Sequence, residues 1–501
     1  MPTTTPSNAP GATDVTRCVS DLLGPPPWPL VGHLLQFDQP RIHLQLEGWA
    51  CVYGPLYRLR FLRTDVVVLA DPDLIVQAFR ARPDTWRRIG SLEPVAREIG
   101  VHGLFTAEGA EWKRQRRLVM RAFDPEHLRR FLPRLQTVTD RLRKRWHRAA
   151  AHGIALDLQP ELMRYAVDAV TGLAFDTDVN TVEDEHDDLN ARLEKVLPMI
   201  NRRLHAVFPY WRFVRLPADR RFDRDLAVIH RMLRDLVVQT REQLAHDTKL
   251  RAAPSNLLQA LIAAQDDDAR DDSTASASAT AALSNEEVIG NLFTVLLAGQ
   301  DTTASTLAWT VCLLHQHPAA WSQLTAEADA AALTPDVSAD AAVPRLSFAQ
   351  ACANEAMRLH PVGPLHYMEA CHDTVVGDVA VPKGTYLFCL TRMGAVDAAR
   401  LPQAGEFRPE RWFDPAQEHA LKRLSIPFGA GPRMCPGRTL AMLEMRMLLS
   451  MLAREFELSD VSTAHGRPPQ ERMGFTVHPE SLRMRLRQRR VEGCAEGHAV
   501  A

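Results

Sequence analysis

The chain has 501 residues, 46% of them hydrophobic and 24% charged, which is enough to bury a large core. Its formal net charge of −2 gives no basic field for nucleic acid, and 7% aromatic residues do not suit a stacking platform for single strands. The 8 cysteines form no CxxC pair, so neither a zinc site nor a dithiol redox motif is predicted.

The start of the chain predicts neither secretion nor a membrane span. Residues 1–17, MPTTTPSNAPGATDVTR, are polar and lack the apolar core of a signal peptide. No later run of about 18 or more uncharged apolar residues is present. We therefore expect a cytoplasmic protein with reduced thiols and no transmembrane segment.

The N-terminal half begins with a tail and turns into helices. Residues 1–23, rich in Pro, Thr, Ser and Ala, predict a disordered tail, and GPPPWPLVGHLLQF predicts a stiff start of the fold. The runs LYRLRF and DVVVLA predict strands, and Asp71-Pro72 predicts the start of a helix. From about residue 110 to 265, apolar residues at three- and four-residue spacing predict helices almost throughout.

Two capping patterns predict helices in the second half. The low-complexity stretch 266–283 predicts an exposed loop, after which Ser284 and Glu287 predict the start of the longest helix, ending near residue 317. Ser347 with Gln350 predicts the start of another helix. Short strand-like segments, a glycine-rich loop and a last helix complete the chain.

The loop PFGAGPRMCPG, residues 427–437, holds too many glycines and prolines for a helix or a strand. It presents Cys435 just before a helix, where amide groups favour a thiolate. An inert buried thiol, a nucleophile and a metal ligand are the alternatives, and no histidine motif near the loop supplies a base. A haem ligand fits well, because glycines admit a flat macrocycle, Phe428 can shield the sulfur and Arg433 can pair with a propionate.

FGAGPRMCPG resembles the haem-binding signature of the cytochrome P450 family, F-x-x-G-x-R-x-C-x-G, at its five fixed positions: Phe428, Gly431, Arg433, Cys435 and Gly437. The resemblance covers about residues 24–480 and implies haem b with Cys435 as the axial thiolate. It also implies the family fold, mainly α with small β-sheets (α+β) and a long central helix over the haem. We expect one such domain over 24–485 and a C-terminal tail over 486–501.

The segment LLAGQDTTAS resembles the family's oxygen-binding A-G-x-D-T-T motif, at Ala298, Gly299, Asp301, Thr302 and Thr303. Small residues leave room over the haem, and a threonine hydroxyl can bond back to the carbonyl of Ala298. The resemblance implies a proton relay through Asp301 and Thr302. A solvated helix face is the alternative. However, the flanking residues are apolar on all sides, so Asp301 is expected to be buried, and because burying its charge is costly, the charge is expected to have a function.

Three further motifs resemble parts of the family. NEAMR and FRPERW correspond to the segments whose Glu355, Arg358 and Arg411 form a structural triad that supports the cysteine loop. EWKRQRR corresponds to W-x-x-x-R, which implies that Trp112 and Arg116 lie near a haem propionate. Taken alone, these patterns also fit a surface ion pair and a basic helix face.

One position departs from the family. In HYMEACHD, Met368 stands where the family usually has an arginine or histidine that contacts a propionate. Methionine cannot form that charged bond, and His366 and Tyr367 are the candidates to replace it.

The resemblance implies a haem-thiolate monooxygenase that inserts one oxygen atom from O2 into a lipophilic small molecule, by hydroxylation or epoxidation. Since the chain ends about 65 residues beyond Cys435, electrons are expected from a separate ferredoxin or flavodoxin-type donor. By analogy with the family, the substrate pocket is expected at 95–108, 362–365, near residue 475, and at Leu296 and Leu297. A basic docking surface for an acidic electron donor is expected to comprise Lys113, Arg114, Lys422, Arg423 and Arg438.

The protein is expected to be a monomer and a soluble, bacterial-type enzyme of secondary metabolism. Two alternatives keep the haem: a peroxygenase or isomerase that needs no reductase, and a haem sensor without turnover. The acid–alcohol pair Asp301 and Thr302 argues against both, because neither needs a relay that delivers protons to O2.

Overall fold

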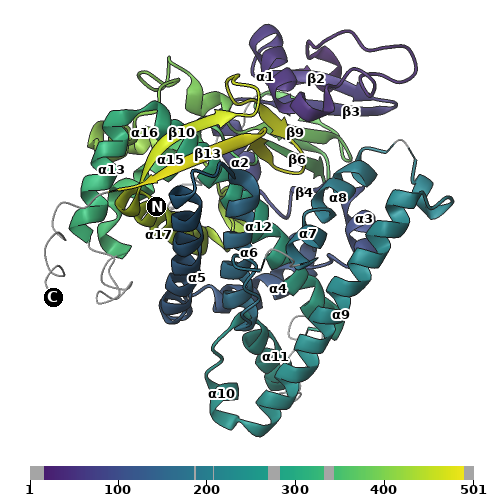
Figure 1. Cartoon of the computed structure of the whole chain (residues 1–501). Helices are drawn as coiled ribbons and strands as arrows, with labels where there is room; N and C mark the ends of the chain where they lie inside the picture. The colour runs from purple at the N-terminus through teal and green to yellow at the C-terminus, as the bar shows by residue number, and fades with distance from the viewer. Residues whose placement is uncertain (1–15, 185–187, 207, 269–282, 332–342, 490–501) are drawn as a thin grey trace, which may run out of the picture.

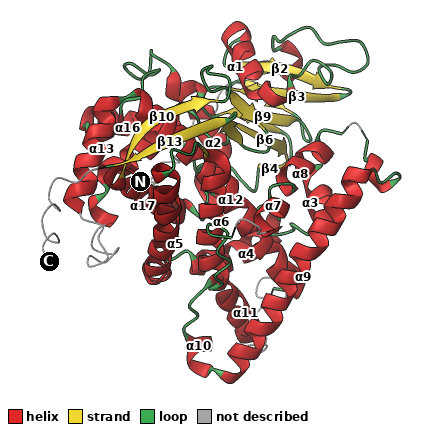
Figure 2. Ribbon diagram, viewed as in Figure 1, coloured by secondary structure: helices red, strands yellow, loops and turns green. Residues whose placement is uncertain are grey.

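The computed structural model describes residues 16–184, 188–206, 208–268, 283–331 and 343–489. Helices make up most of the molecule, and the strands gather on one side, at the top of Figure 2. The predicted class, mainly α with small β-sheets, is confirmed. Most of the predicted loop at 266–283 lies outside the described residues.

The α-helices that the structure describes are α1 Ile42–Tyr53, α2 Pro72–Arg80, α3 Leu92–Ile99, α4 Gly109–Ala122, α5 Pro125–Ala151, α6 Leu158–Phe175, α7 Asp188–Leu193, α8 Val196–Leu204, α9 Pro217–His246, α10 Thr248–Ala252, α11 Leu257–Asp268, α12 Asn285–Gln316, α13 Pro318–Ala331, α15 Ser347–Leu359, α16 Pro415–Leu424 and α17 Arg438–Glu455. Short 3₁₀ turns lie at Val19–Asp21, Gln39–Arg41, Tyr210–Arg212, Val343–Arg345, Met393–Val396, Pro409–Phe413 and Gly431–Arg433.

The largest sheet has five strands in the order β2 Leu56–Phe61, β3 Thr64–Leu69, β9 Tyr386–Leu390, β6 Leu365–Ala370 and β4 Trp86–Arg88. Three smaller sheets combine β1 Arg17–Cys18 with β8 Val379–Val381 and β7 Thr374–Val376, β10 Phe456–Thr463 with β13 Leu482–Gln488 and β5 Leu156–Asp157, and β11 Glu471–Met473 with β12 Val477–Pro479. Within the predicted tails, β1 pairs with β8 and β13 reaches Gln488, whereas residues 1–15 and 490–501 lie outside the described residues.

Helices begin at all three predicted starts, but the capping box predicted at the third is absent. Asp71 caps α2, and Ser284 and Glu287 form the predicted capping box of α12. The second predicted box does not form, because Ser347 is already the first residue of α15. Instead Glu327 of α13 accepts from the amides of Phe348 and Ala349, the latter at 2.9 Å. A carboxylate from a neighbouring helix thus caps the N-terminus of α15, in place of the side chains within the local sequence.

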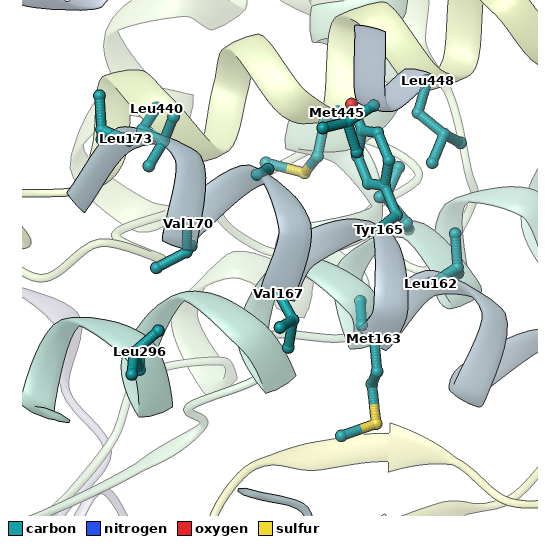
Figure 3. Close-up of a cluster of buried hydrophobic side chains, with 14 of the residues drawn as sticks. Leu162, Met163, Tyr165, Val167, Val170, Leu173, Leu296, Leu440, Met445 and Leu448 are labelled. Carbon is teal, nitrogen blue, oxygen red and sulfur yellow. The ribbon is translucent and has the colours of Figure 1, made fainter. Parts of the chain in front are cut away.

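The central helix α12 lies in the middle of the molecule and packs along α6 (Figure 1). Figure 3 shows side chains of α6 between Leu296 of α12 and Leu440, Met445 and Leu448 of α17. A Cβ added to Gly299 would overlap Val170 of α6, so this glycine lets the two helices approach closely. The buried core therefore fixes α12 against the helix that follows the cysteine loop.

Among the residues that the structure describes, no helix combines the length and the apolar character needed to cross a bilayer.

Candidate active site

The candidate active site is a cavity of about 380 Å³ between α12 and the loop that carries Cys435. Helices α4 and α17, strands β4 and β6 and the β11–β12 hairpin supply much of the rest of its lining. Cys435 is the only cysteine among the described lining residues.

The cysteine loop is fixed by its glycines and by backbone hydrogen bonds. Gly431 has φ 70°, and a Cβ there would lie 2.8 Å from the carbonyl oxygen of Phe79, so the loop packs directly on α2. The amide of Cys435 donates to the carbonyl of Phe428 at 2.9 Å. This bond joins the two ends of the predicted signature and leaves Phe428 lining the cavity next to the thiol.

The environment of Cys435 opposes and supports a thiolate at the same time. Its side chain is accessible only because it opens onto the cavity, while protein surrounds it on its other sides. Burial raises the pKa of the thiol, and the amides of Gly437 and Arg438, which donate to the sulfur, counteract this rise. These amides lie at the start of α17, where the helix dipole also favours negative charge.

Helix α12 provides the opposite wall. Ala298, Gly299, Thr302 and Thr303 line the cavity, and the hydroxyl of Thr302 donates to the carbonyl of Ala298 at 2.7 Å, the back-bond expected from the sequence. Asp301 does not line the cavity: it accepts a hydrogen bond from the hydroxyl of Thr476. Burial raises the pKa of Asp301, while Thr476 and the charge of His478 lower it.

The prediction of the substrate-pocket lining is wrong for two residues. Leu296 and Leu297 are buried in the helical core and do not line the cavity, because α12 turns their side chains toward its neighbouring helices. Val295 of α12 reaches the cavity instead. Phe105 and Phe475, from the expected segments, do line it, and their rings lie 5.9 Å apart.

Trp112 and Arg116 lie one turn apart on α4 and both line the cavity, near Arg433. The guanidinium of Arg433 sits 4.5 Å from the ring centre of Trp112, donates to the carbonyl of Ala107 and pairs with Glu108. Its Nε and Nη1 are buried and have no hydrogen-bond partner within the described part of the chain. Burial lowers the pKa of Arg433 to about 10, so an additional anion at this end of the cavity would be stabilised.

The structure supplies the cations that the sequence lacks at Met368. Met368 is buried in a core cluster, whereas its cross-strand partner on β4, Arg88, lines the cavity. Arg82 also lines it and is only 6% exposed, and none of the described residues accepts a hydrogen bond from its Nε or Nη2. His366 lies beside these arginines, and burial followed by their positive charges lowers its pKa to about 3. Sequence reasoning missed Arg82 and Arg88, because only the strand register brings Arg88 opposite Met368.

The three residues of the expected triad lie together in the core. Glu355 accepts from Arg358 at 2.8 Å and from Arg411 at 2.9 Å, and from the indole of Trp412 at 2.9 Å. Arg358 also donates hydrogen bonds to the carbonyls of Ala395 and Ala404. One carboxylate therefore ties α15 to the segment that leads into the cysteine loop. The surface alternative is excluded, since the side chains of Glu355 and Arg358 are 0% exposed.

A second carboxyl group, Glu444 of α17, was missed by sequence reasoning. It lines the cavity, and only 1% of the residue is exposed. Burial raises its pKa to about 8, which the hydroxyl of Thr303 offsets in part. Nothing in the helix pattern of TLAMLEMRM marks this glutamate as facing inward, apart from its spacing of four residues from Leu440.

One residue of the expected basic docking surface for the electron donor is not available at the surface. Arg114 pairs with Glu287 and its side chain is only 18% exposed. Lys113, Lys422 and Arg423 are well exposed, each within 3.5 Å of an acidic side chain.

Comparison with known proteins places the chain in a family. The family model described as Cytochrome P450 matches residues 22–486, and the chain belongs to this family. It is 26% identical over 464 residues to pentalenene oxygenase from Streptomyces avermitilis, covering 92% of this chain and 96% of the relative. It is 27% identical over 474 residues to cyclooctatin synthase from Streptomyces melanosporofaciens, covering 94% and 96%. A solved cytochrome P450DA heme domain shares the fold, with TM-score 0.79, 22% identity and coverage of 94% of this chain and 98% of that one.

The protein is therefore a cytochrome P450 monooxygenase that binds haem b through a cysteine thiolate and needs a substrate, O2 and a redox partner. The cavity fits this cofactor. It joins one thiol, flanked by glycines that admit a flat ring, to buried arginine N–H groups that lack acceptors and match the two carboxylates of haem.

Removing the charge of the buried Glu355 should lower the free energy of unfolding more than removing the charge of an exposed ion-pair residue. The variant Glu355→Gln leaves two buried arginines without a counter-charge, so we expect it to lose about 3–5 kcal/mol of stability and to be purified with less haem per chain. The haem-to-protein absorbance ratio and thermal unfolding measure both effects. Glu93→Gln, which breaks the exposed pair with Arg97, is the control. Equal haem content in both variants would show that the triad does not support the cofactor site.

The raised pKa of Glu444 predicts a pH dependence of stability. Between pH 4.5, its ordinary pKa, and about 8, the folded protein holds a proton that the unfolded chain has lost, so stability falls as pH rises. The variant Glu444→Gln lacks this penalty. Its free energy of unfolding should exceed that of the wild type by an amount that grows toward pH 8, by up to about 1.4 kcal/mol per unit. Denaturant titrations from pH 5.5 to 8 with a constant difference would contradict this assignment.

Proposed function

We propose that the protein inserts one oxygen atom from O2 into a lipophilic small molecule, by hydroxylation or epoxidation, with Cys435 as the axial haem ligand. The observation that carries this proposal is a single cavity that has the Cys435 thiol on one wall and Thr302 on the other. When bound, a thiolate-ligated haem activates O2 with two electrons and two protons, so that one oxygen atom enters the substrate and the other leaves as water.

Asp301 and Thr302 are proposed to deliver the protons. The hydroxyl of Thr302 lines the cavity, and its bond to the carbonyl of Ala298 orients Oγ1. The carboxyl of Asp301, one residue earlier and behind this wall, has a raised pKa and can hold a proton near neutral pH more readily than an ordinary aspartate. Thr302 would pass a proton from Oγ1 into the cavity, and Asp301 would restore it.

The cationic end of the cavity is proposed to anchor the haem propionates. Arg433, Trp112 and Arg116 have the roles expected from the sequence, and their shared position at one end of the cavity supports this. Arg82 and Arg88 join them in place of a cation at Met368. Phe428 is proposed to shield the sulfur, and Gly437 to leave space beside it. Glu355, Arg358 and Arg411 are proposed to hold the loop in place.

The substrate is proposed to be lipophilic because apolar groups make up much of the cavity lining, among them Leu104, Phe105, Val295, Val362 and Phe475. The names of two Streptomyces relatives, pentalenene oxygenase and cyclooctatin synthase, support a role in secondary metabolism. We further propose one haem domain over 24–485 and a monomer in the cytoplasm, with electrons from a ferredoxin or flavodoxin-type protein.

The proposal is tested by turnover with labelled O2. In a system with a reductase, a ferredoxin and NADPH, and with ligands first selected by their effect on the haem spectrum, one product oxygen should carry the label. Thr302→Val should retain haem and binding but divert electrons to H2O2, with product per NADPH falling about 10-fold or more, in the range of acid–base contributions. Thr137→Val, on the exposed face of α5, is the control.

Two outcomes would overturn this function. Product formation from H2O2 without any reductase, at a rate equal to that of the complete system, would favour the peroxygenase or isomerase. Ligand binding without any labelled product would favour the sensor.

The donor proposal predicts a salt-dependent docking step. In the double variant Lys113→Gln and Lys422→Gln, reduction by an acidic ferredoxin should slow about 3- to 10-fold at low salt and approach the wild-type rate at high salt. Lys249→Gln in α10, which lies at the opposite end of the molecule from α16 in Figure 1, is the control. Unchanged rates and unchanged salt dependence would remove these lysines from the docking surface.

A further inference from the structure

The β11–β12 hairpin joins the cavity to the outer side of α12. Met473, Gly474, Phe475 and Thr476 line the cavity at its tip. The tip is held in place by the amide of Val477, which donates to the carbonyl of Val362 at 2.9 Å. Strand β12 then packs along α12. The hairpin is thus in contact with both the substrate region and the helix that carries Asp301.

Thr476 is the hydrogen-bond partner that the structure gives to Asp301. Its hydroxyl donates to Oδ2 of the carboxylate, and only 7% of the residue is exposed. A hydroxyl is also an acceptor, so this contact can remain when Asp301 is protonated, with the donor reversed. The bond fixes the orientation of Asp301 from outside α12, through a residue that the acid–alcohol motif does not contain.

His478 lies two residues beyond Thr476 on β12, the strand that packs along α12, and its charge acts on Asp301. It is half-buried, and the carboxylate of Asp301 supports its protonated form, whereas burial and the charge of Arg472 disfavour that form. Arg472 is its cross-strand partner and forms an ion pair with Glu480 at 2.9 Å, with side chains 51% and 42% exposed. Solvent, this surface pair, His478 and Asp301 therefore follow one another from the outside inward.

A second acid faces Asp301 from the turn between α7 and α8. Asn190 donates to Glu194 at 2.8 Å, and the amide of Gln300 donates to Asn190 at 2.7 Å. Partial burial and the charge of Asp301 raise the pKa of Glu194, and Arg164 and Lys195 lower it. Glu194 has its own cations, so among the described residues His478 is the basic group that acts on Asp301.

We propose that His478 passes protons from solvent to Asp301, and that Thr476 holds the Asp301 carboxyl in the orientation that receives and relays them. This inference rests on the proposed function, in which Asp301 restores the proton of Thr302. Protonated His478 gives a proton from a ring nitrogen, by way of an intervening water, to the carboxylate of Asp301, and this transfer leaves the charge of the pair unchanged. Once Asp301 has passed a proton to Thr302, His478 takes one proton from solvent and the starting state is restored. His478 and Thr476 are positioning residues, because they act through Asp301.

The coupling is tested without turnover by titrating His478 by NMR in the diamagnetic ferrous carbon-monoxide form of the holoenzyme. The His478 ring signal is identified by its absence in His478→Gln. In Asp301→Asn the imidazolium loses its facing carboxylate, so the midpoint of His478 should shift to lower pH. An unchanged midpoint would show that the two groups are not coupled and would overturn the proposal.

The role in proton delivery is tested by the fate of electrons. His478→Gln should raise the share of electrons lost to H2O2 at least about threefold, a small part of what acid–base groups contribute, and should change the pH profile and the solvent isotope effect of product formation. The control His465→Gln removes an exposed histidine from the loop between β10 and β11 and should change none of them. A His478→Gln enzyme that matches this control would overturn the proposal.

Two replacements of Thr476 distinguish the loss of its hydroxyl from a change in the packing of the hairpin. Thr476→Val keeps the shape of the side chain but removes the hydroxyl, and should uncouple turnover as His478→Gln does. Thr476→Ser keeps the hydroxyl and should restore coupling. Equal uncoupling in both Thr476 variants would assign the effect to packing of the hairpin and overturn this role. If the wild type yields no labelled product while the His478 midpoint still depends on Asp301, the proposed function fails and the coupling stands.

Discussion

Cys435 must carry negative charge at a position where burial opposes it. The protein meets this constraint by ending a glycine-rich loop at the start of α17, so that the amides of Gly437 and Arg438 point at the sulfur. Amides alone leave the pKa of the thiol above its ordinary value. A positively charged metal centre would supply what remains, since a coordinating thiol is deprotonated outright. The loop, the triad behind it and the cations beside it all follow from this requirement.

The cavity combines a cluster of arginines with buried acids. Among the described residues, Arg433 and Arg82 keep N–H groups without acceptors, although Arg433 pairs with Glu108. Asp301 lies behind the α12 wall, and Glu444 lines the cavity from α17. Such an arrangement is costly for a protein alone, because unpartnered buried polar groups lose their hydration. It becomes favourable once an anionic, planar cofactor pairs with the arginines. The two acids have raised pKa values because they are held in a low-dielectric region.

The sequence predicted the parts of this site that are encoded within one segment. The cysteine loop, the back-bond of Thr302 and the one-turn spacing of Trp112 and Arg116 each depend on residues close in the chain. Other features depend on partners far away in the sequence. Arg88 lies opposite Met368 and lines the cavity because β4 pairs with β6, Glu327 caps α15 from α13, and Gly299 makes room for Val170 as well as for the cavity. Leu296 and Leu297 were misplaced because an all-apolar helix does not reveal which of its faces meets the cavity.

The measurement that tests this account most directly is the absorption spectrum of the purified protein after reduction and addition of carbon monoxide. With Cys435 bound to haem iron as a thiolate, the Soret band should move to the long-wavelength position peculiar to thiolate adducts, and Cys435→Ser should abolish that band. A wild-type Soret band at the shorter wavelength of imidazole-ligated haem would contradict the central claim.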